Sequence, residues 1–356
     1  MRYSADAADP GRVRKEPTIP QLIPIDAWNA AAPLKALQVE PMSLQVFYTR
    51  SNFGVPEVNM DSWQLTVGGL VDAPRVFSLD DLRGLGESTE VVTLECAGNG
   101  RTLMEPVPEG TPWHLGAVSV GEFTGVPLSR VLEEVRSEAV ATEFVFTGAD
   151  QGVVEPEGTI NYAFSLEAEA ALTVGPLLAW GMNGRPLLPD HGAPLRLLVP
   201  GTYGMSSVKW LTTITAIDEP FTGHFRLKYR YFEDPSEAEE SPVGPVRVRS
   251  LITRPEDGAT SGEGVEVEGV AWSGHGSIVS VAVQIDDGEW FEAELGPSGG
   301  RFAPTPWSVD ASLRAGTHVI AARASDEAGQ AQPLAPVWNR YGYGNNAVHR
   351  IRVTVA

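Results

Sequence analysis

The chain has 356 residues, of which 42% are hydrophobic and 20% are charged, a composition typical of a globular protein rather than a disordered one. This length favours two domains over a single core. The formal net charge of −20 argues against a nucleic-acid surface, because such a surface needs clustered cations to neutralise phosphates. The sequence contains no apolar run of about 18 residues, so we expect no membrane span.

The first 40 residues are rich in Pro and Ala and lack periodicity. We expect residues 1–40 to form an extended arm laid over the main domain, with disorder as the alternative. The N-terminus lacks the apolar segment of a signal peptide. This predicts a cytoplasmic protein as the sequence stands, or a periplasmic one if a leader has been removed.

Residues 44–49 show the alternation of a strand. Arg50 would then follow a strand end, where side chains converge on sites, although a surface arginine is the ordinary interpretation. A second strand is predicted over residues 63–71. A short helix follows, with Ser78 as its N-cap.

The only cysteine, Cys96, follows a buried strand predicted over residues 91–94 and precedes a turn that contains Gly98 and Gly100. A lone cysteine cannot form an internal disulfide, and no neighbouring cysteine or histidine offers a zinc-type spacing. Cys96 is therefore a core side chain, a nucleophile or a ligand to a soft metal. Arg101 could fold back toward the sulfur and favour the thiolate, which is the form that binds metals.

The middle of the chain predicts an amphipathic helix that ends near residue 135 and a strand over residues 143–150. That strand ends at Asp150, for which a turn-forming role is the alternative. Further on, His191, Arg196 and Lys209 lie around Gly-rich turns, with strands predicted over residues 195–199 and from about 208. Cations beside exposed backbone N–H groups are what a phosphate-bearing cofactor requires.

Residues 226–232 carry Tyr229 and Tyr231, which we expect on one face of a strand. Residues 236–245 are acidic and Pro-rich and predict a linker. Residues 246–356 contain repeated short alternating runs separated by Gly, Asp, Pro and Ser. This pattern predicts an antiparallel sandwich of immunoglobulin type without the inter-sheet disulfide.

Three motifs carry a resemblance to a known family. Residues 96–101 read CAGNGR, which resembles the CAGN-x-R signature of the sulfite oxidase family. Residues 182–210 resemble its MNG-x-PL, DHG-x-P-x-R and VKW block, and residues 338–350, WNRYGYGNNAVHR, resemble its closing segment. The resemblance implies an α+β fold, in which a mixed, mainly β molybdopterin-binding domain over residues 41–235 precedes an immunoglobulin-like domain that makes a homodimer.

The resemblance also implies roles for individual residues. Cys96 would ligate molybdenum held by a pyranopterin dithiolene, and Arg50 and Arg101 would bind the substrate anion. Trp113 would line the oxyanion pocket, and Tyr229, or else Tyr231, would contact a substrate oxygen. The cofactor is expected as the monophosphate form of molybdopterin, with no haem in this chain; its implied contacts are Tyr48, Thr49, Arg50, Asn52, Cys96, Asp150, His191, Arg196, Ser207, Val208 and Lys209.

The implied activity is oxidation of sulfite to sulfate, with electrons passed to an external acceptor such as a cytochrome, a quinone-linked partner or oxygen. Four positions depart from the family pattern: Asn52 replaces a histidine, Gly100 an arginine, Lys228 an aspartate, and Tyr341, beside Arg340, an anion-binding arginine. Three alternatives remain open. They are reduction of nitrate or of an S- or N-oxide on the same cofactor, a non-catalytic binding homologue, and a hydrolase with a cysteine nucleophile.

Overall fold

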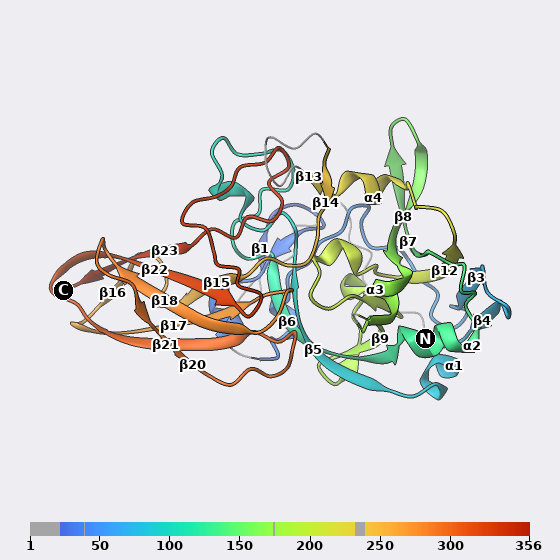
Figure 1. The fold of residues 1–356 in the computed structure, drawn as a ribbon, viewed down its shortest axis with the longest axis horizontal. Helices are drawn as coiled ribbons and strands as arrows, with labels where there is room; N and C mark the ends of the chain where they lie inside the picture. The colour runs from blue at the N-terminus through green and yellow to red at the C-terminus, as the bar shows by residue number, and fades with distance from the viewer. Residues whose placement is uncertain (1–21, 39, 174, 232–238) are drawn as a thin grey trace.

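The computed structural model describes residues 22–38, 40–173, 175–231 and 239–356. The molecule has two parts along its longest axis, with the C-terminal strands at one end (Figure 1). One hydrophobic cluster fills the N-terminal part, and a second fills the C-terminal part. The first cluster also includes Leu251, Val270, Trp272 and Tyr343, so the two parts share a packed boundary.

The first sheet of the N-terminal part carries Cys96 at the end of one strand. Its order is β10-β9-β6-β5, with β11 also paired to β9, and every pairing is antiparallel. Cys96 follows β5 directly, which confirms the predicted strand before it. The strands are β5 (Ser88–Glu95), β6 (Val118–Pro127), β9 (Leu177–Met182), β10 (Arg185–Pro186) and β11 (Arg196–Leu198).

The second sheet has the order β4-β3-β12-β7-β8. Strands β3 and β12 pair in parallel, whereas the other pairings are antiparallel. The strand predicted over residues 63–71 is confirmed as β3. The strands are β3 (Leu65–Gly69), β4 (Arg75–Phe77), β7 (Glu143–Val154), β8 (Gly158–Glu167) and β12 (Leu211–Ile217).

The helices of this part are short. Ser78 caps α1 through a capping box with Asp81, which confirms the predicted N-cap. The predicted amphipathic helix is α2, which buries Leu128, Val131 and Leu132. The α-helices are α1 (Leu79–Gly84), α2 (Leu128–Glu134), α3 (Ala168–Thr173) and α4 (His224–Lys228); the 3-10 helices are η1 (Leu34–Gln38), η2 (Leu44–Val46), η3 (Arg101–Leu103), η4 (Pro189–His191) and η5 (Gly204–Ser206).

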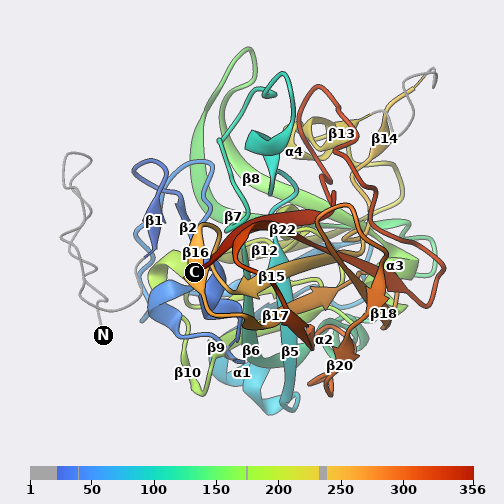
Figure 2. The same ribbon diagram turned by 90° about the vertical axis from the view of Figure 1, so that its left-hand side faces the viewer.

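The C-terminal part is a sandwich of two sheets, as predicted (Figures 1 and 2). Strand β23 buries every second residue, the pattern of a strand with one face against a core. One sheet has the order β15-β17-β21-β20, from β15 (Arg249–Arg254), β17 (Gly264–Trp272), β20 (Glu294–Leu295) and β21 (Thr305–Ser312). The other has the order β16-β23-β22-β18-β19, from β16 (Ala259–Ser261), β18 (Ile278–Ile285), β19 (Phe291–Glu292), β22 (Gly316–Asp326) and β23 (His349–Val355).

Three predicted local structures are wrong. Residues 44–46 form the 3-10 helix η2 rather than a strand, and the adjacent Phe47 and Tyr48 are both buried, which the alternation of a one-faced strand does not allow. Asp150 lies inside β7 instead of at its end, within a break in register between β7 and β8. Tyr229 is the C-cap of α4 and Tyr231 belongs to another element, so the two do not share a strand face.

The predicted arm and linker lie partly outside the described residues. Within residues 22–38, β1 (Ile23–Pro24) pairs with β2 (Ala30–Ala31), and Ala32 N donates to Gly116 O at 2.8 Å. In the predicted linker, β14 (Ser241–Pro242) pairs with β13 (Arg230–Tyr231). Across the described ranges, no helix is both long enough and apolar enough to cross a membrane.

Candidate active site

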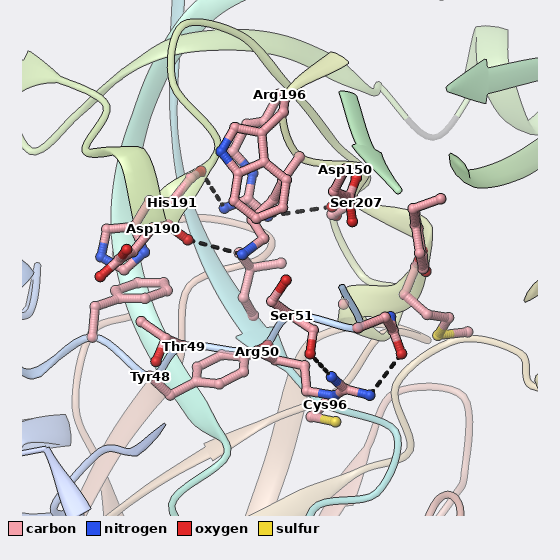
Figure 3. A pocket seen from close by; sticks show the side chains of 18 of the residues that line it. Tyr48, Thr49, Arg50, Ser51, Cys96, Asp150, Asp190, His191, Arg196 and Ser207 are labelled. Carbon is pink, nitrogen blue, oxygen red and sulfur yellow. Dashed lines mark hydrogen bonds between the residues drawn. The ribbon is translucent and has the colours of Figure 1, made fainter. Parts of the chain in front are cut away.

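A pocket in the N-terminal part gathers most of the predicted site residues (Figure 3). Its wall is formed by residues 47–52 after η2, by residues 96–97 after β5, by Asp150 at the break in register of β7, and by residues between 190 and 210 that precede β12. Further side chains that sequence reasoning missed, including Tyr162 and Asp190, complete it. The predicted residues that line it are Tyr48, Thr49, Arg50, Asn52, Cys96, Asp150, His191, Arg196, Ser207, Lys209 and Tyr229.

Cys96 is part-buried and lies at the floor of the view in Figure 3, beneath Arg50. Its backbone N–H donates to Ala117 O at 2.9 Å, and its carbonyl accepts from Asn99 N at 2.9 Å. The turn needs glycine, because a Cβ on Gly98 would lie 2.5 Å from the Arg101 guanidinium and because Gly100 has a φ of 83°. The backbone turn therefore presents a single thiol to the pocket.

Arg50 is held by oxygens around it. One terminal nitrogen donates to Asn52 Oδ1 at 2.7 Å, and the other contacts Ser51 O and donates to Asn29 Oδ1 at 3.3 Å. Asn29 is buried and also accepts from Ser51 N at 3.1 Å, so it fixes the whole segment. Sequence reasoning missed Asn29, because it lies 21 residues from Arg50 and no local pattern links the two. The guanidinium is thereby pre-oriented without a carboxylate partner among these bonds, which suits it to an anion.

A second group of cations lies at the other side of the pocket. Arg196 donates to His191 O at 3.1 Å and Ser207 O at 3.4 Å, while Lys209 donates to Asp190 O at 2.9 Å. The Arg196 Nε is buried and has no hydrogen-bond partner among the described residues. An unpaired buried donor is costly, so an anionic group bound here would stabilise the site.

Burial shifts the pKa values in this corner. Loss of hydration, with repulsion from Arg196 as the second cause, lowers the pKa of Lys209 to about 7. Burial lowers the pKa of Arg196 to about 10 and, with help from both cations, that of His191 to about 3. Burial raises the pKa of Asp150 to about 6, although Lys209 opposes this shift. His191 is therefore neutral at pH 7, Arg196 is fully charged and Lys209 is about half protonated.

Three predicted residues do not line the pocket. The Arg101 guanidinium is held by backbone carbonyls, because Nε donates to Tyr341 O at 2.9 Å and Nη1 to Thr111 O at 2.5 Å. Trp113 is fully buried behind Tyr48, with a ring-centroid separation of 6.3 Å. Val208 is fully buried, and its carbonyl accepts from Leu197 N at 2.8 Å.

Two tyrosines that the sequence left as alternatives are separated by the structure. Tyr229 lines the pocket, whereas the Tyr231 hydroxyl contacts the Arg247 guanidinium. Tyr229 also packs against Tyr343, with ring centroids 5.5 Å apart, and Tyr343 stacks on Tyr341 at 5.6 Å. Sequence reasoning missed Tyr343, although it lies within the closing motif.

The pocket offers one thiol and separate cationic groups for an anion. Among the described residues, no three His, Cys, Asp or Glu side chains are grouped so that they could hold a metal ion. Cys96 is the one thiol that the sequence contains, and its thiolate is a soft ligand. The buried unpaired donor on Arg196 and the single thiol both fit a cofactor that brings a phosphate and a thiophilic metal.

Two family models together match most of the chain. The model for the oxidoreductase molybdopterin-binding domain matches residues 52–225. The model for the Mo-co oxidoreductase dimerisation domain matches residues 242–356.

Individual proteins agree with these matches. The chain is 36% identical over 337 residues to the mitochondrial sulfite oxidase of Macaca fascicularis, which covers 87% of this chain but only 61% of that protein. It is 32% identical to the sulfite oxidase of Arabidopsis thaliana, covering 92% of this chain and 91% of that one. Among solved structures, the sulfane dehydrogenase SoxCD from Paracoccus pantotrophus aligns with a TM-score of 0.80 and 26% identity, over 92% of this chain and 86% of that one.

Proposed function

Because the chain belongs to the sulfite oxidase family of molybdenum oxidoreductases, we propose that it oxidises sulfite to sulfate. Sulfite and one water yield sulfate, two protons and two electrons. The observation that carries this proposal is the joint presence of Cys96 and Arg50 in one pocket with a buried, unpaired Arg196 donor. The chain spans about three fifths of the length of the mammalian relatives, 61% for the macaque protein, so the acceptor of the electrons is also a proposal.

The cofactor we propose is molybdenum-molybdopterin in its monophosphate form. Cys96 would hold the metal through its thiolate, and Arg196, Lys209 and Ser207 would hold the phosphate. The Arg196 Nε and the Lys209 ammonium are the donors that such a group would satisfy. When bound, the cofactor supplies the oxygen-atom transfer and accepts the two electrons.

The protein's own contribution is placement and charge. Arg50 would bind the sulfite oxygens through its forked donors and orient the sulfur lone pair toward the centre of the pocket. Tyr229 and Asn52 line the same pocket, and Asn52 accepts from Arg50 at 2.7 Å, so the Tyr229 hydroxyl shares the pocket with the cation that would bind sulfite. Desolvation raises the pKa of Tyr229, and its phenol therefore keeps its proton and donates to a bound oxyanion at neutral pH.

We further propose a homodimer through the C-terminal domain and an external one-electron acceptor, such as a cytochrome, a quinone-linked partner or oxygen. The match of residues 242–356 to a dimerisation domain supports the first part. Two successive one-electron transfers would be needed to return the site to its oxidised state after each sulfite.

Reduction of nitrate or of an S- or N-oxide is a second candidate. Tyr341 favours it, because this position lacks the cation that the family resemblance places there, and a less positive wall holds a dianion less tightly. The backbone carbonyl of Tyr341 accepts from Arg101, so this segment also takes up part of a guanidinium that would otherwise serve an anion.

The test is sulfite-dependent reduction of ferricyanide by protein of measured molybdenum content. We expect turnover proportional to bound molybdenum, and loss of both molybdenum and turnover in Cys96→Ser. Full molybdenum loading without sulfite turnover would reject sulfite while leaving the cofactor in place, and the oxidised substrates would then be assayed with a reduced dye. A Cys96→Ser protein that retains molybdenum and activity would reject the ligand role of the thiol.

A further inference from the structure

The residue immediately before Cys96 is a buried carboxylate. Glu95 ends β5 and has 1% of its surface exposed. Its Oε1 accepts from Asn99 Nδ2 at 3.0 Å and pairs with Arg249 Nε at 3.2 Å, and its Oε2 accepts from Trp272 Nε1 at 2.9 Å. Such a group is costly to bury unless it is paired in this way, so its partners fix its position closely.

Two of these partners come from the C-terminal domain and lie side by side. Arg249 begins β15 and Trp272 ends β17, and the two residues are direct partners in the antiparallel ladder. One rung of the sandwich therefore presents both donors to Glu95. Arg249 is itself buried, with 3% exposed, and also donates to Asn99 O at 3.3 Å.

The same domain binds the backbone of the loop that follows Cys96. Gly344 N donates to Ala97 O at 2.8 Å, and Asn345 Nδ2 donates to Gly100 O at 2.7 Å. Three of the four carbonyls of residues 97–100, those of Ala97, Asn99 and Gly100, thus accept hydrogen bonds from across the domain boundary. A Cβ on Gly100 would lie 3.1 Å from Asn345 Nδ2, so glycine permits this close approach.

We propose that the C-terminal domain has a second role besides dimerisation. It holds residues 96–101, the Cys96 loop, in the geometry that receives the metal, and we call its contacts with Glu95 and this loop the junction. Glu95, Arg249 and Trp272 are positioning residues that act through this loop. The effect of the junction on metal binding rests on the proposed function, whereas the rigidity of the Cys96 loop can be measured whether or not that function is correct. Among the described residues that line the pocket, those on the Arg50 segment make no hydrogen bond to this junction, so substrate binding is separable from it.

The chain offers a matched pair of tryptophans for the test. Trp272 and Trp307 are both buried in the C-terminal domain, with 4% and 2% exposed. Trp272 Nε1 donates to Glu95, whereas Trp307 Nε1 has no partner among the described residues. Trp272→Phe and Trp307→Phe make the same change in size, but only the first removes a hydrogen bond from the junction.

The readout is amide hydrogen exchange of residues 96–101 in the full chain, with molybdenum content measured for each sample. We expect exchange to be about tenfold faster in Trp272→Phe and unchanged in Trp307→Phe. Molybdenum should dissociate faster from Trp272→Phe alone, and its kcat should fall while its KM for sulfite stays within about twofold. Equal exchange in the two variants, whether raised or unchanged, would overturn the proposal.

A second pair covers the case in which Trp272→Phe does not fold. Glu95→Gln keeps an oxygen acceptor but loses the ion pair with Arg249. Glu268→Gln is its control, because the half-buried Glu268 pairs with Arg254 at 3.5 Å and accepts from Gln38 Nε2 at 2.6 Å, and within the described ranges its side chain makes no hydrogen bond or ion pair to residues 96–101. We expect faster exchange of residues 96–101 in Glu95→Gln only. No change in Glu95→Gln would overturn the proposal even if sulfite turnover were confirmed, and a changed exchange without any turnover would reject the function but not the junction.

Discussion

Lys209 and Arg196 place two cationic groups in the same corner of the pocket, and the repulsion between them contributes to a Lys209 pKa of about 7. Asp150 lies in the same pocket, where burial raises its pKa to about 6. Below pH 6 the carboxyl is neutral and the ammonium is charged, whereas above pH 7 the carboxylate is charged and the amine is neutral. The net positive charge of the corner therefore falls between pH 5 and pH 8.

Anion affinity should follow this charge. For the cofactor-free protein, we expect the affinity for sulfate, whose charge is constant over this range, to fall on the order of tenfold for each group as pH rises from 5 to 8. Isothermal titration calorimetry would measure it. Asp150→Asn should remove the step near pH 6, and Lys209→Met should remove the step near pH 7. A pH profile that neither variant changes would contradict this account of the corner.

Substrate binding should depend on Arg50. Replacement Arg50→Met removes the forked donor from the pocket, and we expect the KM for sulfite to rise about 10- to 100-fold, with Arg50→Lys recovering only part of this loss. The affinity of the unaltered protein should also weaken as salt rises, because its net charge of −20 repels an anion that only the local cations attract.

Arg75→Met is the matched control for Arg50. Arg75 is exposed, pairs with Glu134 at 2.8 Å and is not part of the pocket lining. The KM of Arg75→Met for sulfite should remain within twofold of that of the unaltered protein. Sulfite affinity that stays constant from low to high salt would reject the role given to Arg50.

Short sequence motifs predicted those parts of the candidate site whose arrangement depends on neighbouring residues. Cys96 sits between a buried strand and a glycine turn, and His191, Arg196 and Lys209 lie on one side of the pocket, because in each case a few neighbouring residues determine the arrangement. The sandwich followed from the two-residue alternation of its strands.

Contacts between distant segments were beyond the reach of such patterns. The prediction for Arg101 rested on its five-residue spacing from Cys96 and had no means of including the bond from its Nε to Tyr341 O, 240 residues away. Glu95 and Arg249 form a pair across the domain boundary that no periodicity marks. The strand predicted over residues 44–49 was wrong because the core takes both Phe47 and Tyr48, a demand made by neighbouring elements rather than by the segment itself.

The position of Tyr341 should tune the choice of substrate. Tyr341 stacks on Tyr343, which packs on Tyr229 at the pocket, so a cation placed here would act on an anion in the pocket through a short aromatic wall. We expect Tyr341→Arg to lower the KM for sulfite about three- to tenfold, an effect that high salt reduces. Tyr341→Phe keeps the stacked ring and should leave the KM unchanged. A similar change in both variants would show that packing, rather than charge, is responsible.

Tyr229 and Tyr231 allow the hydroxyl in the pocket to be tested against one outside it. Tyr229→Phe removes a phenol that lines the pocket, and we expect kcat for sulfite to fall about 10- to 100-fold with little loss of stability. Tyr231→Phe removes a hydroxyl that contacts Arg247, and it should lower the free energy of unfolding by about 1 kcal/mol while kcat stays within twofold. Steady-state kinetics and thermal unfolding of both proteins distinguish the two roles. A fall in kcat in Tyr231→Phe, with none in Tyr229→Phe, would move the proton-donating role to the second tyrosine and require the Arg247 segment to reach the pocket.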